Sequence, residues 1–168
     1  MDTAMRNFML KKESIETKSK EVFSERDWRI LRENNGILIK GGHCPNPIRE
    51  WKDLQDLPRE VRYNLEDNGF TKPMPIQMQA VPIGMNMRDM IGLAPTGSGK
   101  SAAFLLPLIS FLLKQPPIKG KLVEDGPYAM IMAPTRELAQ QIEKEFVKLT
   151  MNTRLRSVVV VGGKSAEE

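Results

Sequence analysis

Apolar positions follow two alternating patterns through the second part of the chain. Apolar residues recur at helical spacing in four stretches, which predict helices over residues 58–68, 75–85, 100–113 and 136–149. Short uninterrupted apolar runs lie between and after them, and are typical of buried strands at residues 90–94, 128–132 and 157–161. Strands that alternate with helices predict an α/β fold with a parallel sheet, flanking helices and right-handed crossovers.

Glycine and proline set the limits of these elements. Gly69 is expected to end the first helix, and Pro82 is expected to bend or end the second. A polar loop separates two strand–helix units at residues 116–126.

The first 47 residues differ in composition from the rest. Residues 1–20 are highly charged and poor in large apolar side chains, which predicts a mobile or weakly helical extension. Residues 23–47 mix charged side chains with glycine and proline, and are interpreted as a linker; a solvated tail is the simplest interpretation of both stretches. We therefore divide the chain into an extension and linker, residues 1–47, and a packed domain, residues 48–168.

The charge balance and the single cysteine indicate which partners and which redox compartment suit the chain. The chain has 25 Lys and Arg against 21 Asp and Glu, a net charge of +4 that is compatible with a polyanionic partner without requiring one. Cys44 is the only cysteine, so no disulfide partner exists within the chain, and a lone thiol suits a reducing compartment. His43 beside it lacks a second pair of ligands, so we interpret both as loop residues and not as a metal site. The polar N-terminus and the short apolar stretches predict neither a secretory signal nor a membrane partner.

The most specific pattern is the run Ala94-Pro95-Thr96-Gly97-Ser98-Gly99-Lys100-Ser101. It fits a phosphate-binding loop, with alanine where the general pattern has its first glycine, and it lies between a predicted strand and a predicted helix. The two glycines let successive N–H groups face phosphate oxygens, and the helix adds its positive end. Lys100 can place its charge on the β- and γ-phosphates, and Ser101 can offer its hydroxyl to Mg²⁺, so both are predicted catalytic residues.

The competing interpretation is a glycine turn that carries Lys-Ser by chance. The loop alone does not separate ATP from GTP, or a helicase from a transporter ATPase or a kinase.

A second run precedes the loop: Gly69-Phe70-Thr71-Lys72-Pro73-Met74-Pro75-Ile76-Gln77. The Gln77 amide can pair with N6 and N7 of adenine, which guanine would frustrate, and Phe70 can stack on the base. Taken alone, Gln77 could equally cap or line a helix while Phe70 belongs to the core.

This run resembles the adenine-reading Q motif of the DEAD-box RNA helicases. That family also has an isolated aromatic residue 17 residues upstream, a position that Trp51 matches. The resemblance implies that Trp51, Phe70, Lys72 and Gln77 contact ATP together with the phosphate loop. Met74 departs from the family, which usually has Ser or Thr there, and so removes a hydroxyl contact toward the loop.

Two further elements resemble the family's RNA-contacting motifs. The run Ala133-Pro134-Thr135-Arg136-Glu137-Leu138-Ala139 is similar to motif Ia, in which a helix start can hold an RNA phosphate. Gly162-Gly163 is similar to the GG element. The resemblance implies sequence-independent contacts to the RNA backbone from Pro134, Thr135, Arg136, Glu137, Gly162 and Gly163. A plain helix cap with a surface arginine is the competing interpretation of the first run.

The resemblance extends from Trp51 to about Glu168. It implies an incomplete RecA-like domain, namely the N-terminal portion of the first of the family's two RecA-like domains. A narrower resemblance, over Phe23 to Asp53, concerns a spliceosomal subfamily that acts at the 5′ splice site. It is carried by the runs Glu25-Arg26-Asp27-Trp28-Arg29, Gly41-Gly42 and Pro45-Asn46-Pro47-Ile48-Arg49. It implies pre-mRNA splicing, spliceosomal protein partners and a nuclear location, or otherwise a cytoplasmic one.

The family's Asp-Glu-Ala-Asp and Ser-Ala-Thr motifs do not occur in the 168 residues. We therefore expect part of a longer ATP-dependent RNA helicase, or a truncated product, that does not hydrolyse ATP alone. The alternative is a non-catalytic module that binds nucleotide or partners. An unrelated phosphate-loop ATPase is disfavoured by the presence of all these motifs together.

Overall fold

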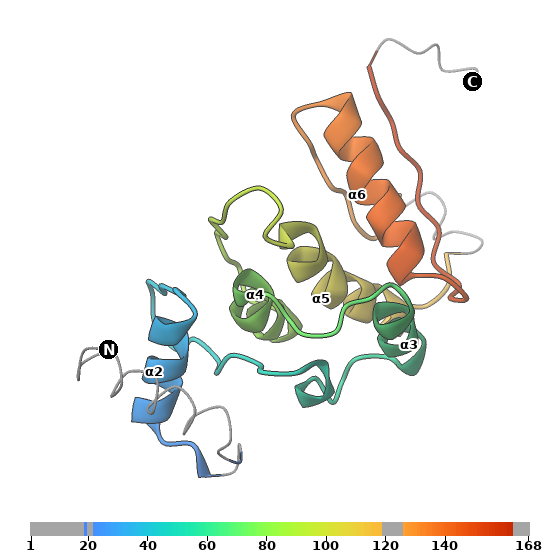
Figure 1. Cartoon of the computed structure of the whole chain (residues 1–168). Helices are drawn as coiled ribbons and strands as arrows, with labels where there is room; N and C mark the ends of the chain where they lie inside the picture. Colours follow the sequence, from blue (N-terminus) through green and yellow to red (C-terminus); the bar gives the residue numbers. More distant parts are fainter. Residues whose placement is uncertain (1–18, 20–21, 119–125, 163–168) are drawn as a thin grey trace. The chain divides into compact units, whose positions relative to one another are not determined.

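The computed structural model describes residues 19, 22–118 and 126–162, drawn in colour in Figure 1. The chain divides into two compact units, Met1–Pro47 and Ile48–Glu168. The predicted extension over residues 1–20 lies outside the described residues, apart from Ser19.

One helix, α2 (Glu25–Asn34), organises the described part of the first unit. The Ser24 hydroxyl accepts from the Asp27 backbone N–H at 3.3 Å, while the Asp27 carboxylate accepts from the Ser24 N–H at 2.8 Å. Trp28 and Leu31 are buried, and the Trp28 ring lies 4.5 Å from that of Phe23. Residues 23–47 were predicted to be a linker, so the presence of α2 differs from that prediction. The sequence signal for the helix was Ser24 followed three residues later by Asp27.

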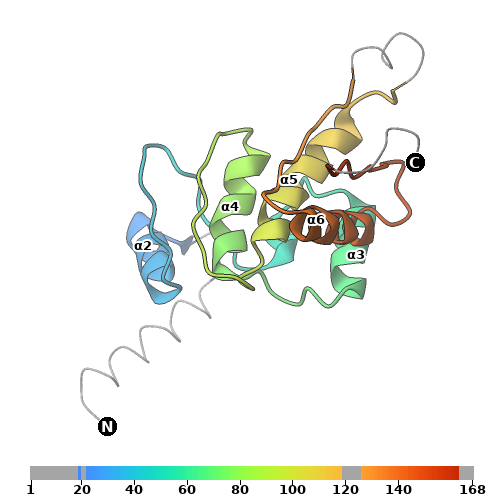
Figure 2. The ribbon, with the colours of Figure 1, turned by 90° about the horizontal axis from the view of Figure 1, so that it is seen from above.

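The second unit contains the 3₁₀ turn η2 (Trp51–Asp53) and four helices: α3 (Arg59–Asp67), α4 (Pro75–Met85), α5 (Lys100–Lys114) and α6 (Arg136–Leu149). All four predicted helices are confirmed to within a residue at each end. α5 lies between α4 and α6, as Figure 2 shows, and α6 also packs on α3. Eight apolar residues of the described chain have no exposed surface and fill the core: Val61, Leu65, Val81, Ala102, Leu105, Leu106, Ile109 and Leu149.

Proline 82 does not end α4, which continues to Met85. A proline inside a helix leaves the carbonyl four residues earlier without its usual donor. Here that carbonyl, of Met78, accepts from the Ile48 backbone N–H at 2.9 Å. The chain entering the second unit therefore supplies the hydrogen bond that Pro82 removes.

Helices α4 and α5 approach each other closely at Gly84. A Cβ atom built on this glycine would lie 2.6 Å from Cγ of Pro107 in α5. Only a residue without a side chain fits there, which fixes how α4 sits against the helix that begins at the phosphate loop.

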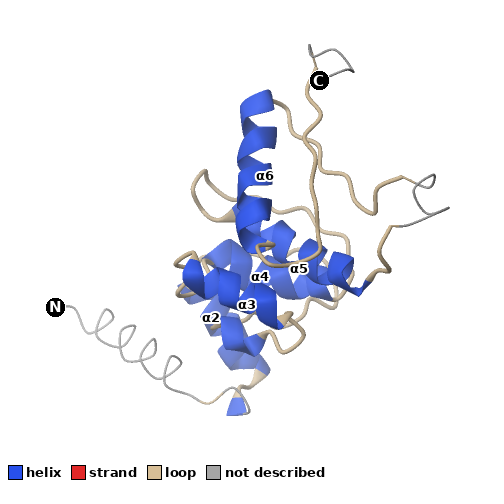
Figure 3. Cartoon of the chain, turned by 90° about the vertical axis from the view of Figure 1, so that its right-hand side faces the viewer, coloured by secondary structure: helices blue, strands red, loops and turns tan. Residues whose placement is uncertain are grey.

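The three predicted strands are not formed in the part of the chain that the structure describes. Residues 90–94, 128–132 and 157–161 run as irregular chain, and Figure 3 draws no strand among the described residues. A strand is stable only when neighbouring chain pairs with its N–H and C=O groups, and no described segment pairs with these. Six large apolar side chains on them are at least three-quarters exposed: Ile91, Leu93, Met130, Met132, Val158 and Val160.

No helix in the described ranges is both long and apolar enough to cross a membrane.

The exposed apolar side chains of these three segments lead to a prediction. We expect the 168-residue chain to bind the dye ANS strongly and to self-associate, because exposed large apolar side chains promote both. Replacing Val158 and Val160 by threonine should lower dye fluorescence and association, whereas Val147→Thr on α6 should change neither. A monomer with little dye binding at high protein concentration would contradict the prediction.

Candidate nucleotide and RNA site

The phosphate loop turns between the segment at residues 90–94 and the start of α5. Gly97 and Gly99 adopt φ of 76° and 78°, a region open to glycine at little cost. The Ser98 hydroxyl donates to the Pro95 carbonyl at 2.7 Å and braces the turn. The Lys100 ammonium donates to the carbonyls of Ala94 at 2.6 Å and Pro95 at 2.5 Å, so its charge lies over the loop. Thr96 is exposed at the tip.

The Gln77 side chain joins the Q-motif segment to this loop. Its Oε1 accepts from the Met74 backbone N–H at 2.8 Å, and its Nε2 donates to the Gly99 carbonyl at 3.1 Å. The side chain is 1% exposed. The amide thus caps α4, as the competing interpretation had it, and also contacts the loop 22 residues away. These two bonds use one lone pair of the amide oxygen and one of the two amide protons.

Gly99 is held by this contact as well as by its backbone angle. A Cβ atom there would lie 2.4 Å from Nε2 of Gln77 and 2.9 Å from the sulfur of Met74. Met74, where the resembling family has a hydroxyl, therefore still lies against the loop, but through a thioether.

Two aromatic rings lie near this segment. Trp51 is buried in η2, and its ring meets that of Phe70 edge to face with centroids 6.4 Å apart. The Trp51 indole N–H has no hydrogen-bond partner among the described residues. The Phe70 backbone N–H donates to the Leu65 carbonyl at 2.9 Å, which places the half-buried ring directly after α3. Lys72 is exposed, and no described contact brings it to the loop.

The start of α6 brings the two RNA-motif candidates together. Thr135 caps the helix by accepting from the Leu138 N–H at 3.2 Å. The Arg136 guanidinium donates to the Gly162 carbonyl at 2.8 Å, across 26 residues. Pro134 and Glu137 are exposed beside them, and Gly163 lies outside the described residues. An exposed cation, a helix N-terminus and a glycine thus share one surface.

Glu145 is a residue near the site that the sequence analysis did not single out. Burial raises the pKa of its carboxyl group, while an interaction with the Ser101 hydroxyl and the charge of Lys148 lower it. The signal was present, since this glutamate interrupts the apolar side of the α6 helix. It places a carboxyl group next to the serine predicted to hold Mg²⁺.

These residues fit a nucleotide with Mg²⁺. Left-handed glycines, a lysine ammonium over the loop, a serine at the first turn of α5 and a buried amide beside the loop form the donor set that a nucleotide phosphate and base require. The described residues contain no cluster of three His, Cys, Asp or Glu side chains that could hold a metal ion.

Comparison with known proteins assigns the family. The DEAD/DEAH box helicase model matches residues 74–168, more than half of the chain. This chain belongs to the DEAD/DEAH box helicase family. The RecA-like fold class predicted from the sequence is confirmed by solved members, although the described segments here form no strands.

Relatives carry splicing names. The chain is 49% identical over 152 residues to the human probable ATP-dependent RNA helicase DDX23, and 50% identical over 151 residues to the Neurospora crassa pre-mRNA-splicing ATP-dependent RNA helicase prp-28. In each case 90% of this chain is covered, with 18% and 21% of the relative. The chain thus spans about a fifth of the length of the curated relatives it matches, and the predicted resemblance to the spliceosomal subfamily is confirmed.

Solved structures agree. The yeast DEAD-box splicing factor Prp28 superposes with a TM-score of 0.82 at 42% identity, over 89% of this chain and 35% of that one. Prp28 from Chaetomium thermophilum, crystallised with ADP, gives a TM-score of 0.78 at 47% identity, over 88% of this chain and 35% of that one.

The contact between Gln77 and Gly99 can be tested with a pair of glycine variants. Gly99→Ala and Gly97→Ala impose the same backbone strain, on the order of 1–2 kcal/mol. Only Gly99→Ala also forces Gln77 away, because nothing lies within 4 Å of a Cβ atom at Gly97. We expect Gly99→Ala to cost about 1 kcal/mol more in urea unfolding, the value of the lost hydrogen bond. Equal losses from both variants would refute the contact.

Proposed function

We propose that this chain supplies the ATP cradle and part of the RNA-contacting surface of an ATP-dependent RNA helicase that acts in pre-mRNA splicing in the nucleus. The observation that carries the proposal is the pair of hydrogen bonds at the Gln77 amide, which accepts from the Met74 N–H and donates to the Gly99 carbonyl, because they put this amide beside the phosphate loop. The splicing names of relatives at about half identity support the cellular role.

The proposed nucleotide contacts follow from the charges of the loop. Phosphate oxygens would accept hydrogen bonds from the backbone N–H groups of residues 97–101. The Lys100 ammonium, which now donates to the carbonyls of Ala94 and Pro95, would instead contact the β- and γ-phosphates. Ser101 would hold Mg²⁺, which neutralises phosphate charge when bound. Adenine would lie by Gln77 and Phe70, with Trp51 behind that ring and Lys72 at the rim.

The proposed RNA contacts are to the backbone. Thr135, Arg136 and Gly162 present an N-terminal helix end, a cation and bare main chain, none of which distinguishes bases. Pro134, Glu137 and Gly163 complete the proposed surface. ATP hydrolysis is not proposed for these 168 residues alone, because the Asp-Glu-Ala-Asp tetrad is not among them.

The base preference of the site is the first test. In calorimetric titrations we expect ADP to bind more tightly than GDP by about 1–3 kcal/mol, the value of a bidentate amide–base pair. Gln77→Glu keeps the acceptor for the Met74 N–H but loses the donor, so the preference should disappear while phosphate binding persists. Lys100→Ala should weaken both nucleotides by about 1.5–3 kcal/mol. Equal affinity of the unaltered chain for ADP and GDP would reject the adenine assignment.

RNA binding is the second test. We expect the chain to bind single-stranded RNA without sequence preference, at or weaker than roughly 10⁻⁴–10⁻⁶ M, with affinity falling as salt rises. Arg136→Ala should weaken binding equally for two unrelated oligonucleotides in fluorescence anisotropy. Nanomolar affinity, or tenfold tightening with a nonhydrolysable ATP analogue, would show instead that the chain works as a complete module.

A further inference from the structure

The C-terminal end of α6 is held by a side chain from another helix. The last carbonyls of a helix have no partner within it. The Asn64 amide nitrogen, in the middle of α3, donates to the Leu149 carbonyl at 2.9 Å and the Met151 carbonyl at 2.8 Å. Asn64 is 2% exposed, and its amide donates both to the last residue of α6, 85 residues away, and to Met151, two residues beyond that helix.

At the C-terminal end of α6, the Phe146 carbonyl receives its hydrogen bonds from a residue close by in the sequence. Both the Thr150 hydroxyl, at 2.8 Å, and the Thr150 backbone N–H, at 2.9 Å, donate to the Phe146 carbonyl inside α6. The Asn64 bonds differ because they join α6 to α3. They therefore fix the position of α6, whereas the threonine bonds affect only its last turn.

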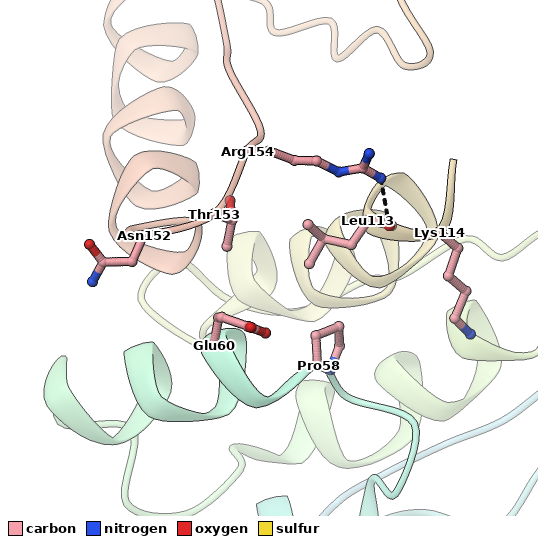
Figure 4. A pocket seen from close by; sticks show the side chains of 7 residues that line it. All are labelled: Pro58, Glu60, Leu113, Lys114, Asn152, Thr153 and Arg154. Atoms are coloured by element: carbon pink, nitrogen blue, oxygen red, sulfur yellow. Dashed lines mark hydrogen bonds between the residues drawn. The ribbon is translucent and has the colours of Figure 1, made fainter. Parts of the chain in front are cut away.

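The chain that follows α6 is tied to α5 at the same place. The Arg154 guanidinium donates to the carbonyls of Leu113, at 2.7 Å, and Gln115, as Figure 4 shows for the first. A pocket of about 420 Å³ marks where the start of α3 and the ends of α5 and α6 converge. Arg154, which lines this pocket, already donates to two backbone carbonyls. The pocket is therefore better explained as a junction between helices than as a ligand site.

The starts of these helices carry the candidate functional residues. α5 starts at the phosphate loop, and α6 starts at Thr135 and Arg136. A helix of the length of α6 is about 21 Å long and nearly rigid, so anchoring one end places the other. α3 in turn leads into Phe70 three residues after it ends.

We propose that Asn64 is a positioning residue for RNA binding: its two hydrogen bonds hold α6 so that Thr135 and Arg136 stand where an RNA phosphate is bound. The inference rests on the proposed function. Asn64 touches neither RNA nor nucleotide and acts through α6.

The test compares Asn64→Leu with Asn68→Leu in the 168-residue chain. Leucine matches asparagine in size and cannot donate. Asn68 is the matched control, because its amide donates at 2.8 Å to the Asn64 carbonyl, inside the α3 segment. RNA affinity is measured by anisotropy, ADP affinity by calorimetry, and the docking of α6 by amide hydrogen exchange.

Asn64→Leu should weaken RNA binding about fivefold to tenfold and speed exchange along α6, while ADP affinity changes less than about twofold. Asn68→Leu should leave RNA affinity and α6 exchange within about twofold of the unaltered chain. If Asn64→Leu does not fold, Asn64→Thr, which keeps one donor, should give a smaller loss of about twofold to threefold with the same selectivity for RNA.

Unchanged RNA affinity and α6 exchange in Asn64→Leu would overturn the proposal. So would equal losses for RNA and ADP, or the same RNA loss in Asn68→Leu. Absence of RNA or adenine-nucleotide binding by the unaltered chain would instead reject the proposed function. Hydrogen exchange would then still decide whether Asn64 anchors α6.

Discussion

The structure of the second unit depends on one buried amide. Gln77 satisfies the backbone N–H of Met74, the residue that precedes α4, with its oxygen and holds the phosphate loop with its nitrogen. It is almost fully buried, so losing either partner would leave a polar atom unpaired in the protein interior. Because the loop opens α5, the same amide sets where α5 begins, and the close contact of Gly84 with Pro107 sets how α5 lies along α4. The nucleotide site and the helical core are thus built on shared contacts.

Much of the fold could be predicted from the sequence because helix formation is local. The helical period, Pro75 at the first position of α4 and Thr135 before α6 mark helix limits within a few residues of chain. α2 was missed because its charged composition obscured the cap at Ser24. Strand pairing is not local: an apolar run indicates a preference for strand and says nothing about its neighbour. Residues 90–94, 128–132 and 157–161 have that preference and no partner in the described chain.

In the candidate site, too, local features could be predicted from the sequence and contacts between distant residues could not. Motif spacing predicted the loop, Gln77 and Arg136 as ligand-binding residues, because phosphate and base chemistry restrict residue types at short spacing. The contacts that link motifs were not visible, since the bond from Gln77 to Gly99 spans 22 residues and that from Arg136 to Gly162 spans 26. Glu145 beside Ser101 was also hidden, although a carboxylate on an apolar helix face was a signal that burial would matter.

Helix polarity explains why the candidate ligand-binding residues lie at the N-terminal ends of α5 and α6. It also explains why side chains that hold these helices in place lie at their C-terminal ends. The N–H groups at the start of a helix attract anions, and both proposed ligands, the nucleotide and RNA, carry negatively charged phosphate groups, so the starts of α5 and α6 can be left to them. The carbonyls at the helix ends repel the same ligands and need donors from the protein. Asn64 and Arg154 are such donors, at the ends of α6 and α5. In α5 and α6, side chains of the protein therefore satisfy the C-terminal end, and the N-terminal end remains available to an anion. The ligand contacts at the N-terminal ends thus rest on helices that are fixed at their other ends.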